Sequence, residues 1–185
     1  MNETIRVLLE RRSIRSYLPD QVQDSDLELI LEAGRYAPSG GNAQPWHFTV
    51  VQDPALLEKM VVAARERMLG SGVPRLVEAA SKPNYSCFHH APTVIIVSGG
   101  SGYCVEADCA NAAENMVIAA TALGLGSCYT ASFVMAFDGP EGPNLRRELR
   151  IPDGYRPMFA ICLGYTAGEK PPAPPRREGV VDYLR

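Results

Sequence analysis

Three stretches of this 185-residue chain combine residue types that could do chemistry. The first is Arg11-Arg12-Ser13-Ile14-Arg15, whose adjacent guanidinium groups and hydroxyl suit a phosphate monoester. Arg15 stands where a longer ligand would present a second anionic group. A solvated basic helix end, which complements the helix dipole, accounts for the same residues. Taken alone, the cluster leaves both interpretations open.

The second stretch is the loop Pro38-Ser39-Gly40-Gly41-Asn42-Ala43-Gln44-Pro45-Trp46. Its small residues let a backbone approach a ligand closely, and its two carboxamides and indole suit a flat polar heterocycle. The alternative is a purely structural loop. The third stretch is Pro174-Pro175-Arg176-Arg177, in which a rigid arm could bring two arginines to a phosphate. Basic tails are common, so this stretch carries little weight alone.

Other kinds of chemistry have weaker support. A net charge of −3 and a pI near 5.6 argue against nucleic-acid or anionic-membrane partners. Ser98 to Gly102 resembles a dinucleotide-binding turn, but Val105 occupies the position of its third glycine, so we interpret it as an ordinary connection. No phosphate-binding P-loop and no nucleophile elbow occur. Cys87-Phe88-His89-His90 lacks the further ligands of a tetrahedral metal site, so we predict no metal.

The five cysteines show no paired spacing and predict free thiols in a reducing compartment. The N-terminal residues lack the basic and apolar regions of a secretory signal. No run reaches the roughly 18 apolar residues that span a bilayer. We therefore expect a cytoplasmic protein.

Hydrophobic periodicity predicts the elements that position these stretches. Ser25-Asp26-Leu27-Glu28 has the form of a capping box, and Gly124 is expected to end a long helix whose small residues predict close packing. Residues 70–90 show the weak periodicity typical of a mobile flap, and residues 170–175 should be extended. Helices are expected at about 3–12, 25–36, from 54, at 105–123 and after 143, and strands at 46–51, 92–97, 127–130 and 158–163. Four strands among about five helices indicate one α+β or α/β domain.

The three stretches, in this order, resemble the nitroreductase family of FMN-dependent oxidoreductases over nearly the whole chain. Arg11 to Arg15 is similar to the family's first signature, and Pro38 to Trp46 matches its Pro-Ser-x-x-Asn-x-Gln-Pro-Trp loop at every named position. Asp108 to Met116 resembles the family's central helix. Leu163-Gly164-Tyr165, followed by a proline arm, resembles the family's ending.

The resemblance implies a fold and an assembly. The fold is an α+β, three-layer α/β/α sandwich with a mixed, mostly antiparallel sheet. It would comprise an FMN-binding domain at residues 1–167 and an arm at 168–185 that packs on the partner subunit. The assembly is an intertwined homodimer, with each FMN site at the interface and built from both chains.

The resemblance also assigns roles to residues. Arg11, Arg12 and Ser13 would hold the FMN phosphate, and Arg15 would face the pyrimidine edge of the ring. The partner would supply part of the site, and backbone amides would lie near flavin N5 where many relatives have glycine or an acidic residue. The partner's contribution would be Pro38, Ser39, Gly40, Asn42 and Gln44, the N5 amides would be those of Ala131 and Ser132, and Arg176 with Arg177 would complete the phosphate site.

The implied activity is ping-pong turnover, in which NADH or NADPH gives hydride to FMN and a nitroaromatic or quinone takes its place over the ring. Because the cofactor would perform the chemistry, no protein side chain is expected to act as a nucleophile. Two alternatives stay open: a flavin carrier or sensor without NAD(P)H turnover, and a reductase or dehydrogenase with a dedicated substrate.

Overall fold

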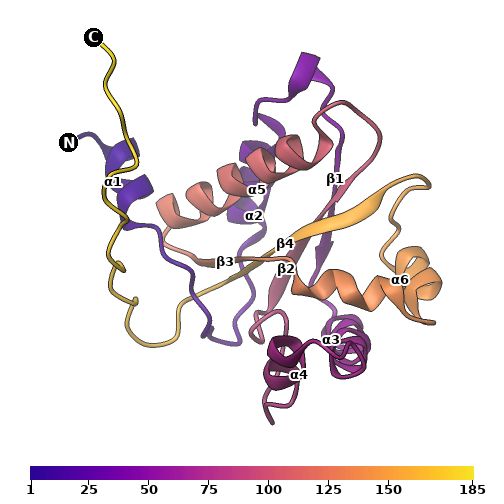
Figure 1. The fold of residues 1–185 in the computed structure, drawn as a ribbon. Coiled ribbons are helices and arrows are strands. Elements are labelled where there is room, and N and C mark those ends of the chain that lie inside the picture. Colours follow the sequence, from indigo (N-terminus) through magenta and orange to yellow (C-terminus); the bar gives the residue numbers. More distant parts are fainter.

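A computed structural model describes all 185 residues and places one four-stranded sheet between two layers of helices (Figure 1). The strands are β1 (Trp46–Val51), β2 (Thr93–Gly99), β3 (Gly126–Thr130) and β4 (Arg156–Gly164). They lie in the order β1-β2-β4-β3, and each neighbouring pair is antiparallel. A parallel bridge between Ser13 and Ser127 extends the sheet beyond β3. The expected mixed, mostly antiparallel α+β sandwich is confirmed.

Alternation along the central strands divides the interior into two cores. Val94 and Ile96 of β2 face the core formed with α3 (Pro54–Leu69), the 3-10 helix η2 (Ser132–Asp138) and α6 (Gly142–Glu148). Ile95 and Val97 face the opposite core, formed with α2 (Asp24–Arg35) and α5 (Val105–Ala122). All seven residues of β2 are buried, as expected for a central strand covered on both faces.

Helix α5 lies almost where its periodicity predicts. Gly124, with a φ of +76°, ends it as expected. The N–H of Leu125 donates to the Ala120 carbonyl at 2.8 Å, and the N–H of Gly124 donates to the Thr121 carbonyl at 3.1 Å. The predicted close packing also occurs, because a Cβ on Gly34 of α2 would lie 2.2 Å from Met116 Cε of α5.

Two helix boundaries differ from the sequence predictions. Helix α1 (Glu3–Glu10) stops before the arginines, and Arg11 is already extended, with a ψ of 136°, because the chain turns toward β3. Helix α2 begins at Asp24 after Gln23, which makes no side-chain capping bond, so the capping box predicted at Ser25 is wrong. Asp24 and Asp26 lie in the first turn and stabilise the start of the helix instead, because their negative charges interact favourably with the helix dipole.

Residues 70–90, predicted as a mobile flap, pack in part against the core of the domain. This segment contains the seven-residue helix α4 (Pro74–Ala80), and Cys87 and Phe88 are buried in the core with α3. The Phe88 ring lies 5.7 Å from that of Phe133. A helix this short has too few turns to show clear periodicity, which explains why the sequence did not indicate it.

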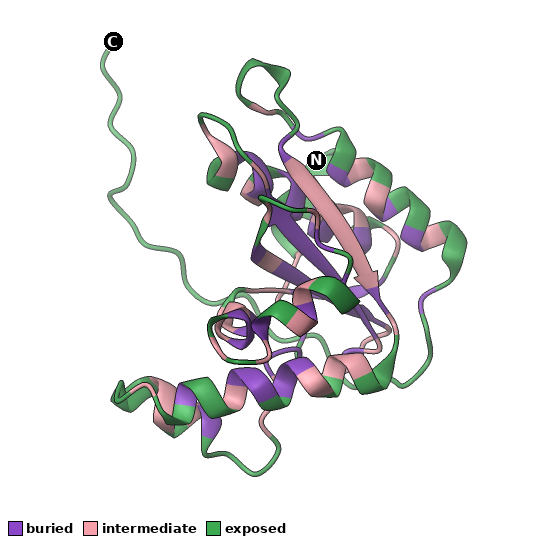
Figure 2. Cartoon of the chain, turned by 90° about the vertical axis from the view of Figure 1, so that its right-hand side faces the viewer, coloured by how far each residue is buried: buried purple, intermediate pink, exposed green.

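The last residues form an extended arm, as predicted. Residues 168–185 are all exposed and contain no regular structure, and the arm projects away from the domain in Figure 2. No helix of the chain has both the length and the apolar character needed to cross a membrane.

We expect the stability of this fold to fall at alkaline pH. Burial raises the pKa of the Cys87 thiol to about 12 from its ordinary value of 9.0. The folded state therefore binds this proton more tightly than the unfolded state does. The resulting contribution to stability is fully present below pH 9 and is lost as the pH rises toward 12. Between pH 8 and pH 10.5, ionisation of this thiol alone should lower the free energy of unfolding by about 2 kcal/mol.

Urea unfolding of the wild type and of Cys87→Ala at both pH values would measure this loss. The variant should lose less stability across the interval than the wild type. Equal losses would show that Cys87 does not carry the effect.

Candidate active site

The arginine cluster lies where α1 joins the edge of the sheet. The N–H of Ile14 donates to the Ser127 carbonyl at 2.8 Å, which fixes the segment along β3. Arg12 folds back, and its Nη1 donates to the carbonyls of Leu9 at 2.8 Å and Arg11 at 2.6 Å. Its Nε is buried and has no hydrogen-bond partner. A buried guanidinium N–H without an acceptor indicates a place for an external anion.

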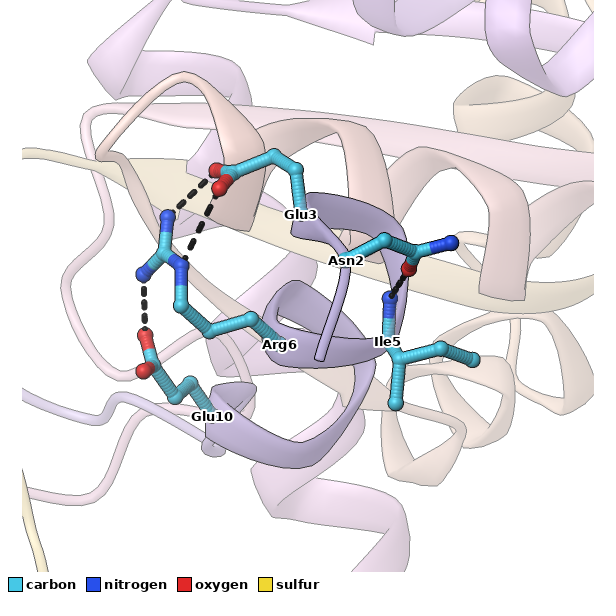
Figure 3. A network of polar contacts seen from close by, with 5 residues as sticks. All are labelled: Asn2, Glu3, Ile5, Arg6 and Glu10. Carbon is cyan, nitrogen blue, oxygen red and sulfur yellow. Dashed lines mark hydrogen bonds and ion pairs between the residues drawn. The ribbon is translucent and has the colours of Figure 1, made fainter.

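Arg6, in the preceding helix α1, provides a contrast. Its guanidinium pairs with Glu3 and, at 2.7 Å, with Glu10 (Figure 3). Arg11 has only a long contact, 3.5 Å from its Nε to Glu114 Oε1. The guanidinium of Arg6 is therefore neutralised by acids of α1, whereas that of Arg11, just after the helix, is incompletely neutralised.

Arg15 lies near Cys128 and His89. Burial raises the pKa of the Cys128 thiol, and Arg15 acts against this shift, followed by Ser13 and Arg11. Burial also lowers the pKa of His89, and the positive charge of Arg15 lowers it further, which keeps this imidazole neutral at pH 7. Arg15 itself is exposed and forms no ion pair, so its charge is available to a ligand.

The two residues predicted near flavin N5 follow directly from β3. Ala131 precedes η2 and Ser132 begins it, with the Ser132 hydroxyl 3.4 Å from Thr130 Oγ1. Ser132 also lines a cavity of about 400 Å³ together with Tyr85 and His89. The segment from Arg11 to Arg15 therefore lies alongside β3 at Ser127, and the start of η2 follows the last residue of the same strand.

The loop from Pro38 to Trp46 is held by α5. The N–H of Gly40 donates to Asp108 Oδ1 at 3.0 Å, and Asn111 Nδ2 donates to the Pro38 carbonyl at 3.3 Å. Asp108 is only 4% exposed, so a buried carboxylate fixes the loop backbone. Sequence reasoning placed Asp108 and Asn111 on the central helix without a role, because nothing local shows that they reach the loop.

Inside this loop, the side chains bind one another and the backbone is strained. The N–H of Gln44 donates to Ser39 Oγ at 3.1 Å, and Gln44 Nε2 donates to Asn42 Oδ1 at 3.0 Å. Asn42 has a φ of 57° and Gln44 a φ of 45°. Left-handed backbone at residues other than glycine is uncommon and concentrates at functional sites.

Within one chain, the predicted site residues form three separate groups. The Pro38–Trp46 loop is attached near the beginning of α5, whereas Ser13 pairs with Ser127 beyond its end. An 18-residue helix spans about 27 Å, which sets the scale of their separation. Arg176 contacts only the Pro174 carbonyl, at 3.5 Å, and Arg177 is exposed. The arm therefore adds nothing to the arginine cluster of its own chain.

The connection from Ser98 to Gly102 leads from β2 to α5. A Cβ on Gly99 would lie 2.5 Å from Val105 Cγ1 and 2.6 Å from Met158 Cε. This glycine therefore allows close packing beneath α5.

Comparison with known proteins identifies the family. The sequence profile of the nitroreductase family matches residues 8–165, most of the chain. This chain belongs to the nitroreductase family. The predicted enzyme class, an oxidoreductase of the nitroreductase type, is confirmed with it.

Individual nitroreductase relatives agree. A solved nitroreductase with bound FMN from Bacteroides fragilis is 34% identical, covers 100% of both chains and has a TM-score of 0.93. A candidate NADH dehydrogenase/NAD(P)H nitroreductase of Archaeoglobus fulgidus is 33% identical over 92% of this chain and 89% of its own. An FMN reductase (NADPH) of Bacillus subtilis is 26% identical over 94% of this chain and 71% of its own.

Proposed function

We propose that this chain is an FMN-dependent oxidoreductase that takes hydride from NADH or NADPH and reduces nitroaromatic, quinone or similar acceptors. The observation that carries the proposal is the buried Arg12 Nε without a partner, beside an incompletely neutralised Arg11 and an unpaired Arg15. A ligand with a phosphate at one end and an electron-accepting ring at the other complements this arrangement. The relatives with bound FMN support the choice of ligand.

Each residue group would have a distinct task. Arg11, Arg12 and Ser13 would bind the phosphate through charge-assisted hydrogen bonds, with Arg176 and Arg177 of a partner arm completing the shell. Arg15 would stabilise negative charge at the pyrimidine edge of the ring, and the start of η2, at Ala131 and Ser132, would orient its reacting edge. When bound, FMN would supply the two-electron chemistry, and the protein would bind, orient and shield it. Nucleotide and acceptor would use the same open face in turn, as ping-pong turnover requires.

We further propose a homodimer in which each site takes residues from both chains. The separation of the Pro38–Trp46 loop and of Arg176 from their own chain's arginine cluster supports this. Exposed apolar side chains on α1 and on the arm need cover of the kind that a second subunit provides. These side chains are Ile5, Leu8, Leu9, Val180, Val181, Tyr183 and Leu184, and all are at least 43% exposed. Five free cysteines support the cytoplasm as the compartment.

Absorbance spectroscopy followed by stopped flow would test the proposed function. The purified protein should show a flavin spectrum, and NADH or NADPH should bleach it within seconds under anaerobic conditions. A protein that stays colourless after incubation with FMN would refute the cofactor. A flavin that neither nucleotide bleaches would instead indicate a carrier or sensor.

A further inference from the structure

The cavity of about 400 Å³ beside Ser132 has an unusual charge distribution for this acidic chain. Arg75, at the start of α4, and Lys82, just after it, both line the cavity. No carboxylate lines it, although the whole chain carries a net charge of −3. The cavity is therefore a local concentration of positive charge on a negatively charged protein.

Neither cation is neutralised by the protein. The ion pairs of the chain involve Arg6, Arg11 and Lys59, and none involves Arg75 or Lys82. Glu78, the single acidic residue of α4, pairs with neither of them.

The rest of the lining provides an apolar wall and neutral polar groups. Met68 is 2% exposed, and Tyr85 donates its hydroxyl hydrogen to Met68 Sδ at 2.9 Å. Burial raises the pKa of Tyr85 to about 12, and that of His89 is lowered by burial and by Arg15, so both are uncharged at neutral pH. His89 has a φ of 53°, which points to a constrained position facing the cavity.

We infer that this cavity selects flat aromatic ligands that carry an anionic group, with Arg75 and Lys82 binding the anion and Met68 with Tyr85 packing on the ring. The inference rests on the proposed function, since Ser132 joins the cavity to the place where the flavin ring would lie. Its volume falls within the range of small-molecule sites. The anion has two sources, a carboxylate on the acceptor or the phosphates of the nucleotide donor.

Isothermal titration calorimetry would test this without turnover. The probes are 4-nitrobenzoate and 4-nitrobenzamide, which share a shape and differ in charge. In Arg75→Gln/Lys82→Gln, the Kd of 4-nitrobenzoate should rise about tenfold, because two partly exposed ion pairs are lost. The Kd of 4-nitrobenzamide should change less than twofold. Arg147→Gln/Arg150→Gln removes the same charge outside the cavity and should change neither value.

Stopped-flow bleaching by NADH and NADPH in the same variants would separate the two sources. If the double variant loses affinity for 4-nitrobenzoate alone, the cations bind an anionic group of the acceptor. If instead only bleaching by the nucleotides is weakened, the cations bind the phosphates of the nucleotide. The inference is overturned if the double variant leaves 4-nitrobenzoate and both nucleotides unaffected, or if it weakens 4-nitrobenzamide as much as 4-nitrobenzoate. Calorimetry needs no electron transfer, so failed bleaching would count against the proposed function and leave the charge preference measurable.

Discussion

Replacing Arg11 and Arg12 together by glutamine is expected to weaken FMN binding by about two to four orders of magnitude. Each guanidinium would lose a charge-assisted hydrogen bond worth about 1.5–3 kcal/mol, and every 1.4 kcal/mol is about tenfold in affinity. Arg12 Nε is already desolvated without a protein partner, so an incoming phosphate meets a donor that does not have to give up water. Quenching of FMN fluorescence on titration with apoprotein would measure the Kd.

Arg6→Gln is the matched control for this experiment. Arg6 lies in α1, just before the cluster, but Glu3 and Glu10 already pair with its guanidinium (Figure 3). Its replacement removes one positive charge close to the cluster and should change the FMN affinity less than twofold. If the double variant binds FMN like the wild type, the phosphate lies elsewhere and the proposed role of the cluster fails.

Removing residues 168–185 is expected to abolish the dimer and to weaken FMN binding by more than about tenfold. The arm carries four of the most exposed apolar side chains of the protein, together with Arg176 and Arg177. Since no residue after Ala167 is buried, the deletion leaves both cores intact and its effects should be confined to assembly and cofactor. Light scattering after size-exclusion chromatography would give the mass, and FMN titration would give the affinity.

Arg176→Gln/Arg177→Gln in the full-length chain separates the two tasks of the arm. This variant should remain a dimer, because the apolar end from Val180 onward is intact, yet bind FMN more weakly. A truncated protein that stays dimeric and binds FMN with unchanged affinity would contradict the arm's proposed place on the partner.

The long and strongly patterned elements could be predicted from the sequence. The apolar run from Thr93, the small-residue helix ended by Gly124 and the Asp53-Pro54 helix start all lie where expected. Asp53 caps α3 by accepting the N–H of Ala55 at 2.9 Å. These features depend on interactions within a few residues, so one segment of sequence contains all the necessary information.

Two short elements, α4 and η2, could not be predicted, because tertiary contacts hold them. Helix α4 has seven residues, and η2 has a 3-10 geometry without the 3.6-residue period. Phe133 of η2 lies between Phe88 and Phe137, with ring centres 5.7 Å and 6.1 Å away. Such packing decides local structure through residues that are distant along the chain.

In the arginine cluster, too, some features follow from the sequence alone and others depend on tertiary contacts. By itself, the sequence determined that Arg11, Arg12 and Ser13 could bind phosphate and that Arg15 could meet a second anionic group, since residue types and spacing fix the donors that they offer. Only the tertiary structure decided which donors are free. It pairs Arg6 with acids, leaves Arg12 Nε buried without an acceptor, and brings His89 and Tyr85 together with Ser132 in one cavity. The physical reason is that desolvation and ion pairing depend on neighbours in space, which the chain acquires only when it folds.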